Sequence, residues 1–96
     1  MDGGDERSAA LHRHLASEDP DTGSAELARL WLTAYEELVG FEELVMSRLT
    51  ELLPTLSKAA RNEAELTNVP MVSQHLQTFR YRRAHWRKRL AELDGH

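Results

Sequence analysis

Apolar side chains recur through residues 25–53 at the spacing of a long amphipathic helix. On a wheel of 100° per residue they form one stripe, and apolar residues on its flanks widen the arc to more than half of the circumference. An arc that broad is too wide for one partner helix, so we expect this helix to contact two neighbours, in the same chain or in another copy. The stripe holds Leu27, Trp31, Ala34, Leu38, Phe41, Val45, Leu49 and Leu52, and Leu30, Tyr35, Met46 and Leu53 widen it.

Two prolines divide the rest of the chain. Pro54 lacks a backbone donor and disfavours a helical residue before it, so the first helix ends or kinks there. We expect a weakly apolar helix over residues 55–67 and a third helix over residues 71–93, which Pro70 either separates from it or joins to it through a bend. The fold class is therefore all-α, either an elongated helical hairpin or a three-helix bundle. Because the middle helix is roughly 20 Å long and the first roughly 43 Å, we expect self-association to complete the core.

The start of the chain differs from the helices. Acidic residues there surround Pro20 and Gly23, which favour a loop. We expect a weakly ordered acidic segment over residues 1–23 and a helical domain over residues 24–94, capped by Ser24. Neither an apolar signal segment nor the ~18 consecutive apolar residues of a membrane helix can be found, so we expect no membrane association and a cytoplasmic location.

Charge is divided unevenly along a chain whose net charge is -4. The first helix is acidic, whereas the stretch FRYRRAHWRKRL at residues 79–90 holds six Arg or Lys residues and three aromatics. Most of these cations border the apolar seam of the last helix, so we expect them to meet acids of the first helix. The alternative is a nucleic-acid-binding regulator, in which the cations contact phosphates. Its contacts would be Arg80, Tyr81, Arg82, Arg87, Lys88 and Arg89.

One acid and one base fall inside the apolar stripes themselves. Glu42 lies within the stripe of the first helix, and Arg83 takes a seam position of the last. Two opposite charges in the seams of one small bundle are costly apart and tolerable together. We predict that they pair, within a chain or between two copies; the alternative is that both reach past the seam to water.

The side chains that carry chemistry form no recognisable site. The chain has no cysteine, and its five histidines include no pair at the i, i+4 spacing of a helical metal site. No Glu-x-x-His sequence, glycine-rich phosphate loop or nucleophile–base spacing occurs. We therefore expect no enzymatic activity, no cofactor and no metal.

These observations favour a small protein–protein interaction module. We expect an adaptor or regulator that self-associates, most simply as a homodimer, and that uses the part of the broad apolar arc left open by the last helix. The residues expected at this interface are Leu30, Phe41, Leu44 and Met46.

Overall fold

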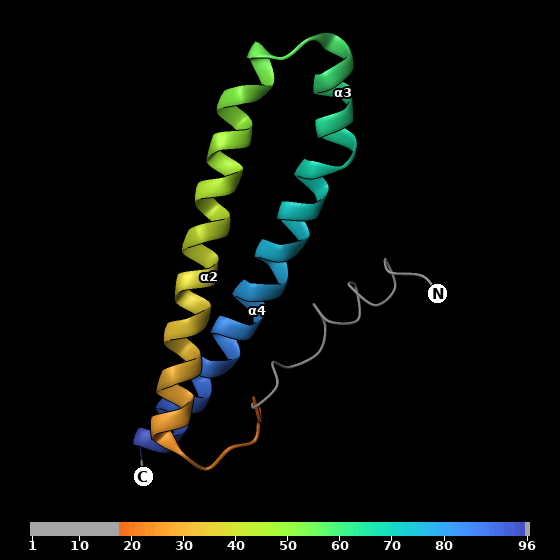
Figure 1. Cartoon of the computed structure of the whole chain (residues 1–96). Helices are drawn as coiled ribbons and strands as arrows, with labels where there is room; N and C mark the ends of the chain where they lie inside the picture. Colours follow the sequence, from red (N-terminus) through yellow and green to blue (C-terminus); the bar gives the residue numbers. More distant parts are fainter. Residues whose placement is uncertain (1–17, 96) are drawn as a thin grey trace, which may run out of the picture.

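Two long helices run antiparallel to each other and form a hairpin (Figure 1). The structure is a computed structural model, and it describes residues 18–95. Helix α2 spans Ala25–Leu52 and continues into a 3-10 turn at Leu53–Thr55; α3 spans Lys58–Leu66 and α4 spans Asn68–Asp94. Helix α3 contacts α4 and does not contact α2. The all-α hairpin is thus confirmed, and α3 is the first part of a bent second arm.

The bounds of α2 follow from its flanking residues. The Oγ atom of Ser24 accepts a hydrogen bond from the backbone N–H of Leu27 at 3.1 Å, which satisfies one of the free donors of the first turn. Glu26 adds a negative charge in that turn, where the helix dipole favours it. At the other end Pro54 stands in the 3-10 turn that closes the helix.

The bend between α3 and α4 lies at Thr67 and not at Pro70. Thr67 has φ −120° and ψ −60°, and its hydroxyl donates to the carbonyl oxygen of Glu63 at 2.7 Å. Pro70 belongs to the first turn of α4, where its missing N–H has no intrahelical partner to lose. Helix α4 therefore begins at Asn68, three residues before the predicted start at residue 71.

The core between α2 and α4 consists of two clusters. One is centred on Ala28, Tyr35 and Trp86, and the other on Val39, Val72 and Leu76. On α2 the side that faces α4 follows the heptad-like spacing 28, 32, 35, 39, 46, 49, as expected for two helices packed along a seam. This inner row is turned away from the centre of the predicted stripe. Three members of that stripe are exposed instead: Leu27, Phe41 and Leu52.

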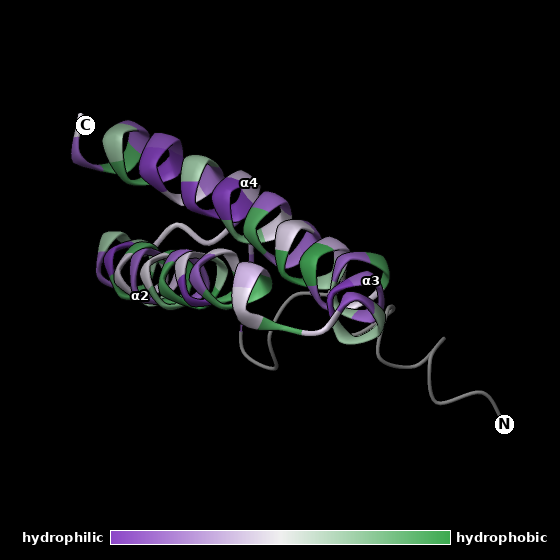
Figure 2. Cartoon of the chain, turned by 90° about the horizontal axis from the view of Figure 1, so that it is seen from above, coloured by the Kyte–Doolittle hydropathy of each residue, from purple (hydrophilic) through white to green (hydrophobic). Residues whose placement is uncertain are grey.

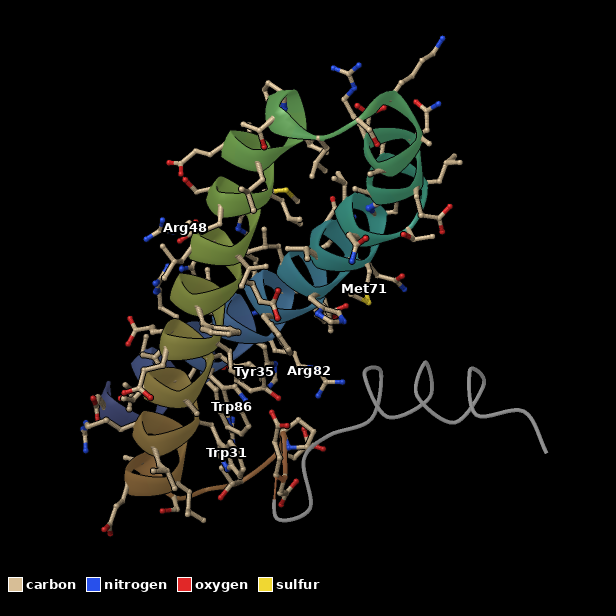
Figure 3. The ribbon with its side chains drawn as sticks, turned by 45° about the horizontal axis from the view of Figure 1, so that its top comes forward. Trp31, Tyr35, Arg48, Met71, Arg82 and Trp86 are labelled. Carbon is tan, nitrogen blue, oxygen red and sulfur yellow. The ribbon has the colours of Figure 1, made fainter. Side chains whose placement is uncertain are left out.

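The described chain is one layer of helices. Its extents are 56 × 34 × 13 Å, and α2 and α4 lie beside each other when the hairpin is viewed from above, with α3 at the near end of α4 (Figure 2). Side chains at the seam, such as Tyr35 and Trp86, lie between the two arms, whereas Arg48 projects from α2 away from α4 (Figure 3). A single layer covers one face of each helix and leaves the opposite face of α2 open.

Candidate functional site

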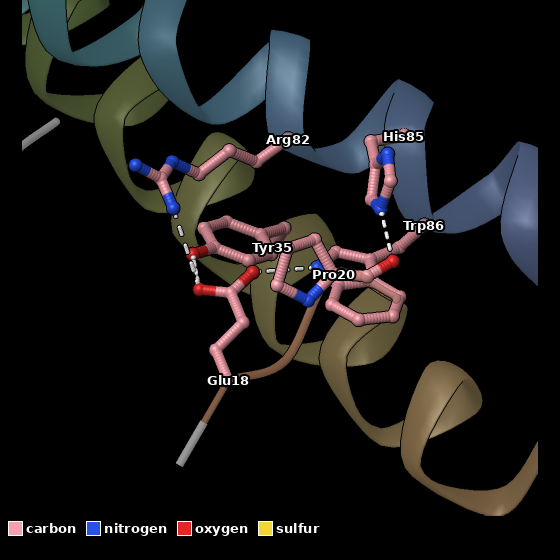
Figure 4. Close-up of polar contacts among 6 residues, drawn as sticks. All are labelled: Glu18, Pro20, Tyr35, Arg82, His85 and Trp86. Carbon is pink, nitrogen blue, oxygen red and sulfur yellow. Dashed lines mark hydrogen bonds and ion pairs between the residues drawn. The ribbon is translucent and has the colours of Figure 1, made fainter. Parts of the chain in front are cut away.

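The carboxylate of Glu18 is buried, and its side chain is 1% exposed. Its oxygens accept hydrogen bonds from Trp86 Nε1 at 2.6 Å, from Tyr35 Oη at 2.7 Å and from Arg82 Nη1 at 3.4 Å (Figure 4). These donors come from both long helices, so one carboxylate joins α2 and α4 to the segment before them. We call these four residues the Glu18 cluster.

The Glu18 cluster changes the acidity of Tyr35. Burial of the phenol raises its pKa to about 12, and the hydrogen bond to Glu18 and the negative charge there act in the same direction. Tyr35 is therefore a neutral donor at all physiological pH values. The Glu18 side chain is covered and its oxygens accept bonds from protein donors, so the cluster holds the segment before α2 against both long helices.

Residues 18–23, which we call the strap, lie along α4. Nε2 of His85 donates to the carbonyl oxygen of Pro20 at 3.0 Å, and Nε of Arg89 donates to that of Thr22 at 3.0 Å. Four of the six described residues of the predicted weakly ordered segment thus form hydrogen bonds to α4, while residues 1–17 lie outside the described part of the chain.

The sequence reasoning missed Glu18, because an acid beside Pro and Asp resembles any solvated loop residue. A signal did exist. Trp86 and Tyr35 both stand on apolar stripes, and a buried indole N–H or phenol O–H almost always finds an acceptor. Two such donors on facing helices required an acceptor between them, although the pattern alone did not say which residue supplies it.

One edge of the α2–α4 interface carries a ladder of three exposed ion pairs. The members are seven residues apart on both helices, so the pairs repeat every two turns. All six side chains are close to half exposed, and such pairs stabilise a fold by about 0–1 kcal/mol each. The ladder consists of Arg29–Asp94 at 3.4 Å, Glu36–Arg87 at 3.9 Å and Glu43–Arg80 at 3.0 Å.

The ladder and the strap together use most of the basic residues of α4. Arg80 and Arg87 meet acids of α2, as expected, while Arg82 and Arg89 bind the strap. Of the six residues expected to contact a nucleic acid, two remain exposed without a hydrogen bond or ion pair to the rest of residues 18–95: Tyr81 and Lys88.

Glu42 has a partner other than the predicted one. Its Oε1 atom lies 3.2 Å from Nδ1 of His75, and the two side chains are 12% and 21% exposed. Arg83 is half-buried and forms no ion pair with any residue from 18 to 95. Pairing of Glu42 with Arg83 between two copies stays a prediction.

The face of α2 away from α4 carries a row of exposed apolar side chains, which we call the outer stripe. Its members recur at helical spacing, and their exposed fractions run from 43% to 61%. Met46, which we expected beside them, instead packs against the cluster around Val39. The outer stripe consists of Leu27, Leu30, Phe41, Leu44 and Leu52.

Two hollows interrupt the surface. A groove between the strap and α4 is lined by both polar and apolar side chains, and its buried acid is already bonded within the Glu18 cluster. A shallower hollow lies on α2 itself, lined by Glu26, Leu27, Arg29, Leu30 and Thr33. In residues 18–95 no group of three or more His, Asp or Glu side chains is placed to hold a metal, and no helix among them has the length and apolarity needed to cross a bilayer.

Comparisons with known protein families, with curated proteins and with solved structures found no match to this chain. Function is therefore inferred from the geometry of the described residues.

Proposed function

We propose that the protein is a self-associating protein–protein interaction module without chemistry of its own, and that the outer stripe is its contact surface. The observation that supports this proposal is the row of five large apolar side chains on a hairpin one layer thick. Scattered apolar residues on a surface are ordinary, but large exposed apolar side chains that recur along one helix face are typical of an interface.

The free energy gained by burying the outer stripe is large enough to hold two copies together. Burying a Leu or Phe side chain contributes about 1.5–3 kcal/mol when it is fully exposed beforehand, and these are roughly half exposed. A second copy brings the same five side chains, so the apolar contact is doubled by symmetry. That total is comparable with the ~4–15 kcal/mol lost in translational and rotational freedom on association. A weak to moderate dimer is the expected result.

The occupant we commit to is a second copy of this chain. The outer stripe and the hollow at Leu30 lie on the same helix face, so two copies can each offer an apolar side chain and receive one. An interface of this kind closes after two subunits, because each copy uses its whole surface once.

Light scattering on a sizing column tests the proposal with the full chain. We expect a dimer that Leu30→Glu and Phe41→Glu each convert to a monomer. The matched control is Ala84→Glu, which adds the same charge at an exposed position of α4. A monomeric wild-type chain at several hundred micromolar would contradict the proposal. If Leu30→Glu lowered the stability of that monomer, a segment of the chain itself would be the occupant.

The alternative function, nucleic-acid binding by the basic stretch of α4, has less support. Its arginines Arg80, Arg82, Arg87 and Arg89 contact other parts of the chain, so binding phosphates would require breaking those contacts. Absorbance at two wavelengths on the same column distinguishes the cases. Nucleic acid that co-elutes with the protein and leaves at high salt would favour the alternative.

A further inference from the structure

We propose that two copies pair antiparallel along α2 about a two-fold axis between residues 35 and 36, with Phe41 of each copy in the hollow beside the partner's Leu30. This inference rests on the proposed self-association and specifies its geometry. It makes Phe41 and Leu30 the central contact and assigns a function to the hollow on α2.

The hollow has the form that receives a side chain from a facing helix. Four of its lining residues stand at positions i, i+3, i+4 and i+7, which is the diamond-shaped hole of knobs-into-holes packing. They are Glu26, Arg29, Leu30 and Thr33, with Leu27 beside them.

Phe41 is the side chain best suited to fill it. It is 61% exposed, the highest fraction in the outer stripe, and it is the only aromatic residue of that stripe. The hollow offers an apolar floor at Leu30 and a guanidinium at Arg29, which can lie over a ring face. An aromatic side chain uses both features, whereas a leucine uses only the floor.

Placing Phe41 opposite the partner's Leu30 fixes the rest of the antiparallel contact. Leu27 then lies opposite the partner's Leu44, so four of the five outer-stripe residues are covered in each copy. Ala34 falls next to the axis, where its small side chain lets the helices approach closely. The partner's Glu37 lies opposite Ala34. The Glu37 side chains of the two copies therefore come near each other across the axis.

A second antiparallel register is possible. With the axis between residues 42 and 43, Glu37 would pair with the partner's Arg48, and Phe41 would lie opposite the partner's Leu44. That register gains two exposed ion pairs but leaves Leu27 and Leu30 uncovered. Burying a leucine contributes more than an exposed ion pair, so the first register is favoured.

Replacing Glu37 separates the two registers by the sign of the effect. Glu37→Gln removes two like charges near the axis in the proposed register, so we expect dimerisation to tighten by roughly two- to five-fold. In the second register the same change removes both ion pairs and weakens the dimer. Arg48→Gln is the companion variant: we expect almost no change in affinity, whereas the second register predicts weakening.

Disulfide trapping gives an independent test, because the chain contains no cysteine. Copies carrying Ala34→Cys are mixed with copies carrying Glu37→Cys and oxidised. A disulfide needs Cα atoms about 4.4–6.8 Å apart, so the proposed register should yield the 34–37 cross-link between copies. A cross-link between Glu37→Cys and Arg48→Cys copies indicates the second register, and a 34–34 cross-link indicates a parallel pair.

The failure of this inference is distinguishable from that of the proposed function. A dimer that forms the 37–48 or the 34–34 cross-link would overturn the register while leaving self-association intact. A chain that remains monomeric in light scattering and forms none of these cross-links would overturn both.

Discussion

The ladder and the Glu18 cluster both join charged side chains to α4, but they differ in exposure. The ladder side chains lie at the surface, 49% to 60% exposed, whereas in the cluster Glu18 and Arg82 are 1% and 9% exposed. Water and salt screen the exposed ion pairs of the ladder and let their side chains rearrange. In the Glu18 cluster no water can replace a hydrogen-bond partner that is lost, so the buried side chains keep one geometry.

The comparison teaches that the number of ion pairs is a poor guide to what stabilises this hairpin. Three pairs on one edge set the relative position of the helices at a small gain in free energy. A single buried carboxylate with its donors from Tyr35, Arg82 and Trp86 holds the strap, α2 and α4 together. Each prediction below tests this difference.

The largest effect is expected from removing Glu18. Glu18→Ala leaves the buried donors of Tyr35 and Trp86 without an acceptor and Arg82 without its buried ion-pair partner, so the free energy of unfolding should fall by about 3–5 kcal/mol. Glu18→Gln should cost less, because the amide oxygen can still accept a hydrogen bond. Urea unfolding followed by circular dichroism measures both. A loss below ~1 kcal/mol for the alanine variant would show that the cluster is not the main polar support.

An intermediate effect is expected at alkaline pH. The pKa of Tyr35 is raised from 10.0 to about 12 in the folded chain, so its contribution to stability is present below pH 10 and is lost as the pH rises towards 12. The loss should be on the order of 2 kcal/mol.

The measurement uses the Tyr81→Phe background, in which Tyr35 is the sole tyrosine. Absorbance titration then follows phenolate formation, and urea unfolding follows stability over the same pH range. Adding Tyr35→Phe should remove this component of the alkaline loss. An unshifted titration of Tyr35 would contradict the burial of its phenol and the contact with Glu18.

The smallest effect is expected in the ladder. A double-mutant cycle of Glu36→Gln and Arg87→Gln should give a coupling of about 0–1 kcal/mol, which falls further when salt is added. The matched cycle in the Glu18 cluster pairs Glu18→Gln with Arg82→Gln. Equal coupling energies in the two cycles, or equal sensitivity to salt, would remove the distinction between exposed and buried charge.

Local signals in the sequence were enough to predict the elements of the fold. Ser24 and Pro54 bound α2 as expected, since a cap and a missing donor act on the residues next to them. Proline inside a helical pattern predicts a break or a bend at Pro70. In the structure it occupies a first turn, and the chain bends at Thr67.

Tertiary features were harder to predict. Helix α2 has two apolar rows, and periodicity alone cannot say which one α4 covers, so Leu27 and Leu52 belong to the predicted stripe although they are exposed. Glu18 was missed for a similar reason. Its role depends on two donors that lie 17 and 68 residues away in the chain, and no local pattern connects them.

The order of positive and negative side chains along the ladder affects how α4 can align against α2. On α2 the sequence of charges is base, acid, acid at residues 29, 36 and 43, and on α4 the opposite signs face them. If α4 slid by seven residues in one direction, Glu36 would face Asp94; in the other direction Arg29 would face Arg87. A hairpin that slips by seven residues therefore brings two like charges together and keeps one opposite-charge pair in place of three, so the ladder favours the observed alignment over these two neighbouring ones.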